Sequence, residues 1–345
     1  MQLCARLHAL EPRRTFQIAR TRTVPYTNVF VRLTDQDGIS GYGEASPNPF
    51  YGETPESVLE RVRAAGPLLS GLRIRSAPDL EPVWTRLWER VAPSRAAQCA
   101  LDLALWDWLA RRENTSVSQL ALRRPPRPVP TFATLGLSAL DEIPSRLEEL
   151  AGFEFLKIKS DTRHGIAPVR AARQRFPGAG IAIDANCSWT EATFEAWVPE
   201  LAQIQTLFLE QPFPPGHPLP QPPAELLLMA DESVVTEEDL DRLPPAFGGF
   251  NIKLVKCGGL TPALRMLARG RNLGLRTMVG CMLESSCLIA AGAAAAQNAD
   301  YADLDGAWLI SNDPFSGWNM QNGCLHPAKE TGLAAQPAPH FFPGS

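Results

Sequence analysis

The chain has 345 residues, of which 45% are hydrophobic and 20% charged, the balance of a folded globular protein. Its formal net charge of −4 gives no general attraction to nucleic acid or to an anionic membrane, so neither is expected as a partner. No stretch approaches about 18 consecutive apolar residues, and the N-terminus has no apolar core long enough for a secretory signal. The seven cysteines include no Cys-x-x-Cys pair, which favours reduced thiols and a cytoplasmic protein.

The first part of the chain predicts strands followed by helices. Two strands flank a turn that contains Asp37-Gly38, and the last helical pattern begins at the N-cap residue Ser94. The predicted strands and helices lie at residues 29–34, 39–45, 55–69, 79–91 and 94–112. This order predicts an α+β domain that ends at the proline-rich segment PPRPVP.

After this proline-rich segment, short apolar runs alternate with segments of helix length, which predicts a parallel sheet. The predicted strands lie at residues 131–135, 155–160, 181–186, 207–211, 227–232, 249–254, 275–282 and 301–305. Eight strands over about 175 residues favour a closed (β/α) barrel over an open doubly wound sheet. No G-x-G-x-x-G motif follows a strand, which argues against a dinucleotide site.

Five consecutive runs end in a charged residue, at steps of 25, 26, 21 and 22 residues: Lys159, Asp184, Glu210, Asp231 and Lys253. This interval matches a strand plus a returning helix in a barrel of about 250 residues, so the charges should gather on one face of the barrel. Three carboxylates without histidine or thiolate are the ligand set that Mg²⁺ prefers. We therefore predict a metal site formed by the three acids.

Lysines flank these acids and are the predicted bases. Lys157 and Lys159 lie two residues apart on a strand and share a face, so their repulsion and burial should lower the pKa of each. Lys253 ends the sixth strand, nearly opposite the second around an eight-stranded ring, so one lysine can remove a proton while the other returns one. Lys157 and Asn186 are predicted supporting residues, and Lys256 is expected to be a solvated or structural charge.

These residues resemble the muconate lactonizing enzyme subgroup of the enolase superfamily along almost the whole chain. The segments that match are LKIKS, EQP, DES and NIKLVKCGG in the barrel and GYGEASP and ALDLALWDWLA before it. The resemblance implies one Mg²⁺ per active site and a (β/α)7β TIM-like barrel beneath an α+β capping domain formed by both chain ends. The predicted division is residues 1–124 for the cap, 125–312 for the catalytic barrel and 313–345 for a segment that returns to the cap.

The segment YADLDGAW resembles the Asp-x-Asp motif of dipeptide epimerases, in which Asp303 and Asp305 would hold the α-ammonium group of the substrate. Two carboxylates on one face form a good clamp for a cation. ARTRTV resembles the loop of L-Ala-D/L-Glu epimerases in which an arginine meets the glutamate side chain; Arg22 is the matching position and Arg20 lies two residues away. Glu284, in CMLESS, is a further candidate substrate-binding residue.

The expected function is a Mg²⁺-dependent dipeptide epimerase. Lys159 and Lys253 would invert the α-carbon of the C-terminal residue of L-Ala-L/D-Glu or another dipeptide through a metal-stabilised enediolate. The same residues suit an N-succinylamino acid racemase, an o-succinylbenzoate synthase or a cycloisomerase, whose substrates lack the free ammonium group. A Schiff-base aldolase that uses Lys253 and a non-catalytic binding barrel are alternatives of another class. Relatives often form homo-oligomers, but the sequence shows no interface.

Overall fold

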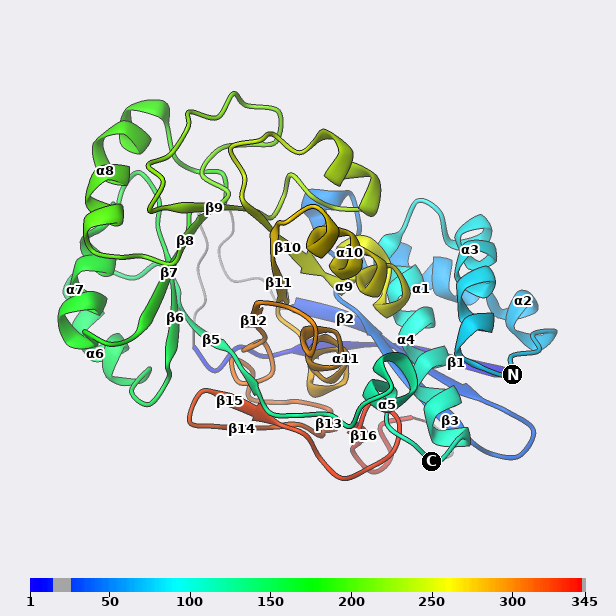
Figure 1. Ribbon diagram of the computed structural model, residues 1–345. Coiled ribbons are helices and arrows are strands. Elements are labelled where there is room, and N and C mark those ends of the chain that lie inside the picture. Colours follow the sequence, from blue (N-terminus) through cyan, green and yellow to red (C-terminus); the bar gives the residue numbers. More distant parts are fainter. Residues whose placement is uncertain (15–25, 343–345) are drawn as a thin grey trace.

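The computed structural model describes residues 1–14 and 26–342, so the predicted residues Arg20 and Arg22 lie outside the described residues. The N-terminal part contains an antiparallel sheet with strand order β1-β2-β3 and a group of helices beside it (Figure 1). Its elements are β1 (Gln2–Leu10), β2 (Tyr26–Thr34), β3 (Ser40–Ala45), the 3-10 helices η1 (Pro49–Tyr51) and η2 (Ala77–Asp79), α1 (Pro55–Ala64), α2 (Gly66–Ser70), α3 (Leu80–Val91), α4 (Arg95–Arg112) and α5 (Val117–Leu122).

Helix α4 is the central element of this N-terminal part. Its residues from Ala96 to Ala110 are all buried, because β3 covers one side and α3, α1 and the barrel helices cover others. The side chain of Ser94 caps the helix by accepting a hydrogen bond from the N–H of Ala97. A helix buried on all sides links the layers of a protein, and α4 therefore joins the N-terminal sheet to the barrel.

The barrel is an eight-stranded sheet with strand order β12-β11-β10-β9-β8-β7-β6-β5, in which every pair is parallel. The strands are β5 (Phe132–Leu135), β6 (Phe155–Lys159), β7 (Gly180–Asp184), β8 (Phe208–Glu210), β9 (Leu227–Ala230), β10 (Gly249–Lys253), β11 (Arg276–Gly280) and β12 (Tyr301–Asp303). The connecting helices are α6 (Ile143–Glu148), α7 (Ala167–Arg175), α8 (Glu191–Gln203), the 3-10 helix η3 (Glu237–Arg242), α9 (Leu254–Cys257), α10 (Leu260–Asn272) and α11 (Ser286–Ala296). All eight predicted strands are present, and the predicted barrel with a cap is confirmed.

Strands β12 and β5 close the ring through side chains. The N–H of Leu304 donates to Thr131 Oγ1 at 2.8 Å, and the N–H of Thr134 donates to Asp305 Oδ2 at 2.7 Å. The amino end of the ring is filled by an apolar layer that includes Phe132 and Phe208. Charged side chains begin above this layer, at the carboxyl ends of the strands, where barrel enzymes have their active sites.

One connection differs from the expected alternation of strands and helices. Residues 211–226, between β8 and β9, contain no helix in the described structure. Residues 212–223 include seven prolines, which lack the N–H that a helix interior requires. This connection is therefore a loop, although the barrel order of the strands is kept.

The C-terminal segment packs against the N-terminal part of the chain (Figure 1). Its strands are β13 (Phe315–Ser316), β14 (Asn319–Gln321), β15 (Cys324–His326) and β16 (Gln336–Pro337), and β15 pairs with β4 (Val129–Pro130) below the barrel. Phe315 stacks on Phe30 of β2 with ring centroids 5.8 Å apart, and the N–H of Leu333 donates to Asp107 of α4 at 2.7 Å. The exact domain boundaries at residues 124 and 312 stay predictions. No helix in the described ranges is long and apolar enough to cross a membrane.

Candidate active site

The strand register brings the predicted charges to one end of the barrel. Lys159, Asp184 and Glu210 are neighbours on β6, β7 and β8, and Asp231 directly follows β9. On the other side of the ring, Lys253 of β10 and Asp303 of β12 both align with Gly280 of β11. The three acids predicted as metal ligands are buried, with exposed fractions of 0%, 0% and 2% for Asp184, Glu210 and Asp231.

Lys157 lies at the centre of this group and is buried. Its Nζ is 2.6 Å from Glu210 Oε2, 2.7 Å from Asp303 Oδ2 and 3.2 Å from Asp184 Oδ2. Burial opposes the charge, but the carboxylates of Asp303, Glu210 and Asp184 outweigh it and hold the pKa of Lys157 well above its usual value. The expected lowering of this pKa is therefore wrong, because three carboxylates surround the lysine.

Each of the two predicted bases pairs with a carboxylate at the end of a neighbouring strand, which is β7 for Lys159 and β9 for Lys253. Lys159 Nζ donates to Asp184 Oδ2 at 2.6 Å, and Lys253 Nζ donates to Asp231 Oδ2 at 2.7 Å. Burial lowers the pKa of Lys253, but Asp231 more than compensates and the pKa lies well above its usual value. Strands β6 and β10 are four positions apart in the eight-stranded order, so the two lysines stand across the ring from each other.

The acids have pKa values shifted in opposite directions. Burial opposes ionisation of Asp184, but Lys159 and Lys157 outweigh burial and lower its pKa. Burial and the neighbouring Asp184 instead raise the pKa of Glu210. Asn251 Nδ2 donates to Glu210 Oε1 at 2.8 Å and fixes the orientation of that carboxylate.

The donor set suits a hard divalent cation. It consists only of buried carboxylate oxygens, and Glu210 Oε2 has no hydrogen-bond partner among the described residues although it lies beside the Lys157 ammonium. Within residues 1–14 and 26–342, no three acidic, histidine or cysteine side chains already form a coordination cluster. The lysine ammonium groups are instead the close neighbours of these oxygens. The chemistry of the site therefore fits Mg²⁺, and the ligand assignment stays a prediction.

Lys256 is structural rather than solvated. It is buried, and its Nζ donates to Asp231 Oδ1 at 2.6 Å, to the Asp231 carbonyl at 2.6 Å and to the Val234 carbonyl at 2.9 Å. Together with Lys253, it places a cation on each oxygen of the Asp231 carboxylate. Burial opposes ionisation of Asp231, but Lys253 and Lys256 lower its pKa despite that burial.

The Asp-x-Asp pair lies at the closure of the barrel. Asp303 Oδ1 is buried and has no hydrogen-bond partner in the described structure, while Oδ2 accepts from Lys157. Asp305 Oδ2 accepts from the N–H of Thr134. Burial and the nearby Asp303 raise the pKa of Asp305 to about 7. A buried carboxylate oxygen without a donor is suited to a cationic ligand.

The other predicted residues have different surroundings. Glu284 is buried, its Oε1 accepts from the N–H of Met282 at 2.8 Å, and burial raises its pKa to about 8. Asn186 has a positive φ of 44° and supports Asp184 through its backbone N–H, which donates to Asp184 Oδ1 at 2.9 Å. The roles proposed for Glu284 and Asn186 stay predictions.

Sequence reasoning missed Asn251 and Thr134. Asn251 lies two residues before Lys253, so the period of two in a strand places both on one face. Thr134 pairs in register with Lys157 and faces the same side of the sheet. Both could have been found by extending the inward-facing alternation from the predicted lysines.

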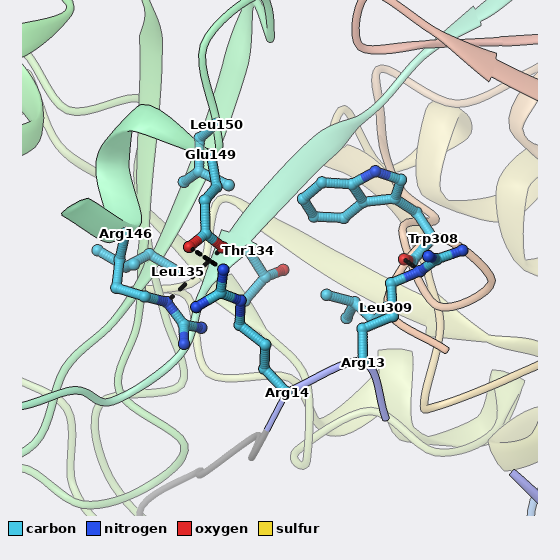
Figure 2. Close-up of a pocket in the computed structure, with 9 residues that line it drawn as sticks. All are labelled: Arg13, Arg14, Thr134, Leu135, Arg146, Glu149, Leu150, Trp308 and Leu309. Carbon is cyan, nitrogen blue, oxygen red and sulfur yellow. Dashed lines mark hydrogen bonds and ion pairs between the residues drawn. The ribbon is translucent and has the colours of Figure 1, made fainter. Parts of the chain in front are cut away.

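A crevice lies beside the closure between β5 and β12 (Figure 2). Its residues are Arg13, Arg14, Thr134, Leu135, Arg146, Glu149, Leu150, Trp308 and Leu309. Arg13 Nε donates to the Trp308 carbonyl at 2.9 Å, and Arg14 pairs with Glu149 at 2.8 Å. In the described chain no helix follows β12, and Arg13 and Arg14 contact residues on both sides of the closure instead.

Comparison with known proteins agrees with this architecture. Residues 142–340 match the family described as Enolase C-terminal domain-like, and residues 4–121 match the Mandelate racemase / muconate lactonizing enzyme, N-terminal domain. The chain therefore belongs to the enolase superfamily, in the mandelate racemase / muconate lactonizing enzyme family.

Three relatives are similar over nearly the whole chain. The L-Ala-D/L-amino acid epimerase of Flavobacterium johnsoniae is 35% identical, over 94% of this chain and 96% of the relative. The L-Ala-D/L-Glu epimerase of Escherichia coli is 34% identical, over 90% of this chain and 95% of the relative. The crystal structure of the dipeptide epimerase from Methylococcus capsulatus, complexed with Mg and the dipeptide L-Arg-D-Lys, has a TM-score of 0.88 and 31% identity, and covers 97% of this chain and 98% of that chain.

Proposed function

We propose that the chain is a Mg²⁺-dependent dipeptide epimerase, which inverts the α-carbon of the C-terminal residue of a dipeptide. The observation that carries the proposal is the pair Lys159 and Lys253, each beside a carboxylate, on strands that face each other across the ring. The epimerase names of relatives that are 34–35% identical support the same reaction.

In the proposed reaction, one lysine removes the α-proton and the other protonates the opposite face. The first lysine acts as its neutral amine: the C–H bond breaks, its electron pair moves toward the substrate carboxylate, and an N–H bond forms on that lysine. The second lysine, as its ammonium form, then gives a proton to the same carbon. Asp184, Glu210 and Asp231 would hold Mg²⁺, which when bound supplies positive charge against the negative charge that develops on the substrate carboxylate. Which lysine acts as the base depends on the configuration of the substrate.

The ammonium end of the dipeptide would bind at Asp303 and Asp305. Asp303 has a buried oxygen to which no described residue donates, and Asp305 lies two residues further on, at the closure of the ring. Charge-assisted hydrogen bonds of this kind are about twice as strong as neutral ones, so they can select free-amino dipeptides over acylated amino acids. This preference separates the proposal from the racemase and synthase alternatives.

The side chains of the substrate are less restricted. L-Ala-L/D-Glu is the first candidate, because Arg22 matches the arginine of L-Ala-D/L-Glu epimerases, and Glu284 is the second candidate residue for substrate contact. Relatives whose names specify L-Ala-D/L-amino acid and L-Ala-D/L-Glu substrates resemble this chain about equally, at 35% and 34% identity. The proposed enzyme is cytoplasmic, consistent with seven free cysteines, and its assembly into a homo-oligomer stays a prediction.

The test is α-deuterium exchange in D₂O with Mg²⁺ and a library of L,L-dipeptides, followed by mass spectrometry. We expect a gain of about one mass unit in particular free-amino dipeptides, because abstraction at the α-carbon exchanges one proton. Exchange confined to N-succinyl amino acids would instead favour the racemase. Trapping of a substrate by borohydride without metal would favour the aldolase, and no reaction in any assay would favour a binding protein.

A further inference from the structure

The segment that follows Lys253 is held by the cap. Helix α9 is a single turn that begins after Lys253 and ends at Gly258 and Gly259, whose φ values are +99° and +123°. A Cβ atom on Gly258 would lie 2.8 Å from Gln98 Oε1, and one on Gly259 would lie 2.3 Å from Asp102 Oδ2. Both glycines are therefore required by their conformation and by the closeness of α4.

Hydrogen bonds from the cap fix this backbone on both sides of the glycines. Trp84 Nε1 of α3 donates to the Gly258 carbonyl at 2.8 Å. The N–H and Oγ1 of Thr261, in the first turn of α10, donate to the two oxygens of Asp102 at 3.0 and 2.6 Å. Asp102 thus caps a barrel helix from another part of the chain.

These cap residues are themselves fixed. Gln98 Nε2 donates to the Trp84 carbonyl at 2.9 Å, which joins α4 to α3. The guanidinium groups of Arg95 and Arg265 lie 5.7 and 4.9 Å from the centre of the Trp84 ring. Helix α9 is the single turn between Lys253 and Gly258, and Lys256 ties that turn to Asp231. Displacement of the glycines would therefore move Lys253.

The strand end of Lys159 is held differently. In the part of the chain that the structure describes, the next residue, Ser160, donates through its N–H to the Asp184 carbonyl at 3.0 Å and through Oγ to the Gly165 carbonyl at 2.9 Å. Trp189 Nε1 donates to Ser160 Oγ at 3.2 Å. All these partners belong to the barrel.

We propose that Asp102 and Trp84 are positioning residues for Lys253, so the cap places one base while the barrel alone places the other. The inference rests on the proposed function, in which Lys159 and Lys253 are the two bases. Its consequence is an asymmetry between the two directions of proton transfer: loosening the cap contact impairs the half-reaction that begins at Lys253 more than the one that begins at Lys159.

The experiment measures initial α-deuterium exchange separately from each epimer of one dipeptide, with Mg²⁺ at fixed pH. Lys159→Ala and Lys253→Ala identify the epimer that each lysine deprotonates. For Asp102→Asn and Trp84→Phe, we expect the exchange rate of the epimer that Lys253 deprotonates to fall about tenfold or more, because small displacements of a catalytic group have large effects on rate. The exchange rate of the epimer that Lys159 deprotonates should change less than about threefold.

The matched control is Asp107→Asn. Asp107 is also a buried aspartate of α4, but it accepts from the N–H groups of Tyr42 and Leu333, away from the catalytic segment. An equal loss for both epimers, or the same asymmetry in Asp107→Asn, would overturn the inference. If Asp102→Asn does not fold, Trp84→Phe decides, because it keeps an aromatic ring between the two arginines and removes the N–H donor.

Amide hydrogen exchange distinguishes failure of this inference from failure of the proposed function. Residues 249–261 should exchange faster in Asp102→Asn and Trp84→Phe than in the parent, while residues 155–160 stay unchanged. This readout needs no substrate. A parent protein that exchanges no dipeptide would refute the epimerase, whereas unchanged protection of residues 249–261 would refute the positioning role by itself.

Discussion

The roles of individual lysines follow from how many acceptors each ammonium group has. Lys157 has three carboxylates around it, and Lys256 has the Asp231 carboxylate and three backbone carbonyls. Lys159 and Lys253 each have one carboxylate partner among the described residues. An ammonium group donates three hydrogen bonds, so of these four lysines only Lys159 and Lys253 have donors that no other described residue occupies.

Replacement of either base should separate exchange from inversion. Lys159→Ala and Lys253→Ala are each expected to lower epimerisation by about 10²–10⁴-fold, the usual contribution of a general acid or base. Each variant should still exchange the α-proton of one epimer, because the remaining lysine can remove and return a proton on its own face. Proton NMR in D₂O measures both rates.

A lysine far from the ring provides the control for these variants. Lys329→Ala changes the C-terminal segment and should leave both rates unchanged. Retention of full epimerisation in Lys159→Ala or Lys253→Ala would rule out the two-base mechanism.

Asp303→Asn tests the ammonium clamp. The substitution keeps the size of the side chain and removes the charge, so kcat/KM for a free-amino dipeptide should fall by about 10–100-fold, as expected for loss of a hydrogen bond between charged groups. Asp303 also pairs with Lys157, so part of the loss is shared by every substrate. The decisive quantity is therefore the ratio of kcat/KM for a dipeptide to that for its N-acetyl form, which should decrease. An unchanged ratio would mean that Asp303 does not bind the ammonium group.

At the scale of elements, the sequence was sufficient to predict the barrel strands but not the bounds of every helix. The barrel strands are short apolar runs, most of which end at or directly before a charged residue, and this pattern predicted all eight within a few residues. The expected helix at residues 55–69 is instead divided into α1 and α2, with Pro67 in the first turn of α2.

The electrostatics of the site required three-dimensional information. The alternation along β6 correctly put Lys157 and Lys159 on one face, but the carboxylates that raise the pKa of Lys157 come from β7, β8 and β12. Their distances depend on register and ring closure, which no local pattern contains. For the same reason, the sequence did not indicate that Lys256 is enclosed by backbone carbonyls.

The contact between α4 and α10 should give stability a pH dependence. Burial raises the pKa of Asp102 to about 7, from a usual 3.8. The folded state therefore keeps a proton that the unfolded chain releases between about pH 4 and pH 7, so the unfolding free energy falls as pH rises through this window. Three pKa units set an upper bound of about 4 kcal/mol for this loss.

Asp102→Asn should remove this part of the pH dependence. We expect the unfolding free energy of the variant to change less between pH 5 and pH 8 than that of the parent, as measured by urea denaturation at each pH. Asp37→Asn, in an exposed turn, should retain the parental slope. Identical slopes in the parent and in Asp102→Asn would contradict the assigned pKa.

At the scale of the whole molecule, acids from the cap hold barrel helices at the side of the ring that contains Lys253. Glu44 of β3 accepts from the N–H groups of Ser285 and Leu288 at 3.0 and 3.2 Å, at the start of α11. Asp102 does the same for α10. Because these helices follow the strands that end in Lys253 and Gly280, the cap is part of the framework of the site.

Removal of metal tests the assembled site. EDTA should abolish dipeptide exchange and Mg²⁺ should restore it, because the cation stabilises charge that the lysines alone do not offset. Mg²⁺ should also raise the unfolding temperature, since a ligand that binds only the folded state stabilises it by about 2.7 kcal/mol at 100 times Kd. In Glu210→Gln this shift should shrink, while in Glu191→Gln, whose side chain is 64% exposed, it should match the parent. The two readouts together separate metal binding from catalysis. If Mg²⁺ raises the unfolding temperature of Glu210→Gln as much as that of the parent, Glu210 is not a metal ligand, even if exchange is lost. Exchange that survives EDTA would refute the metal-dependent mechanism altogether.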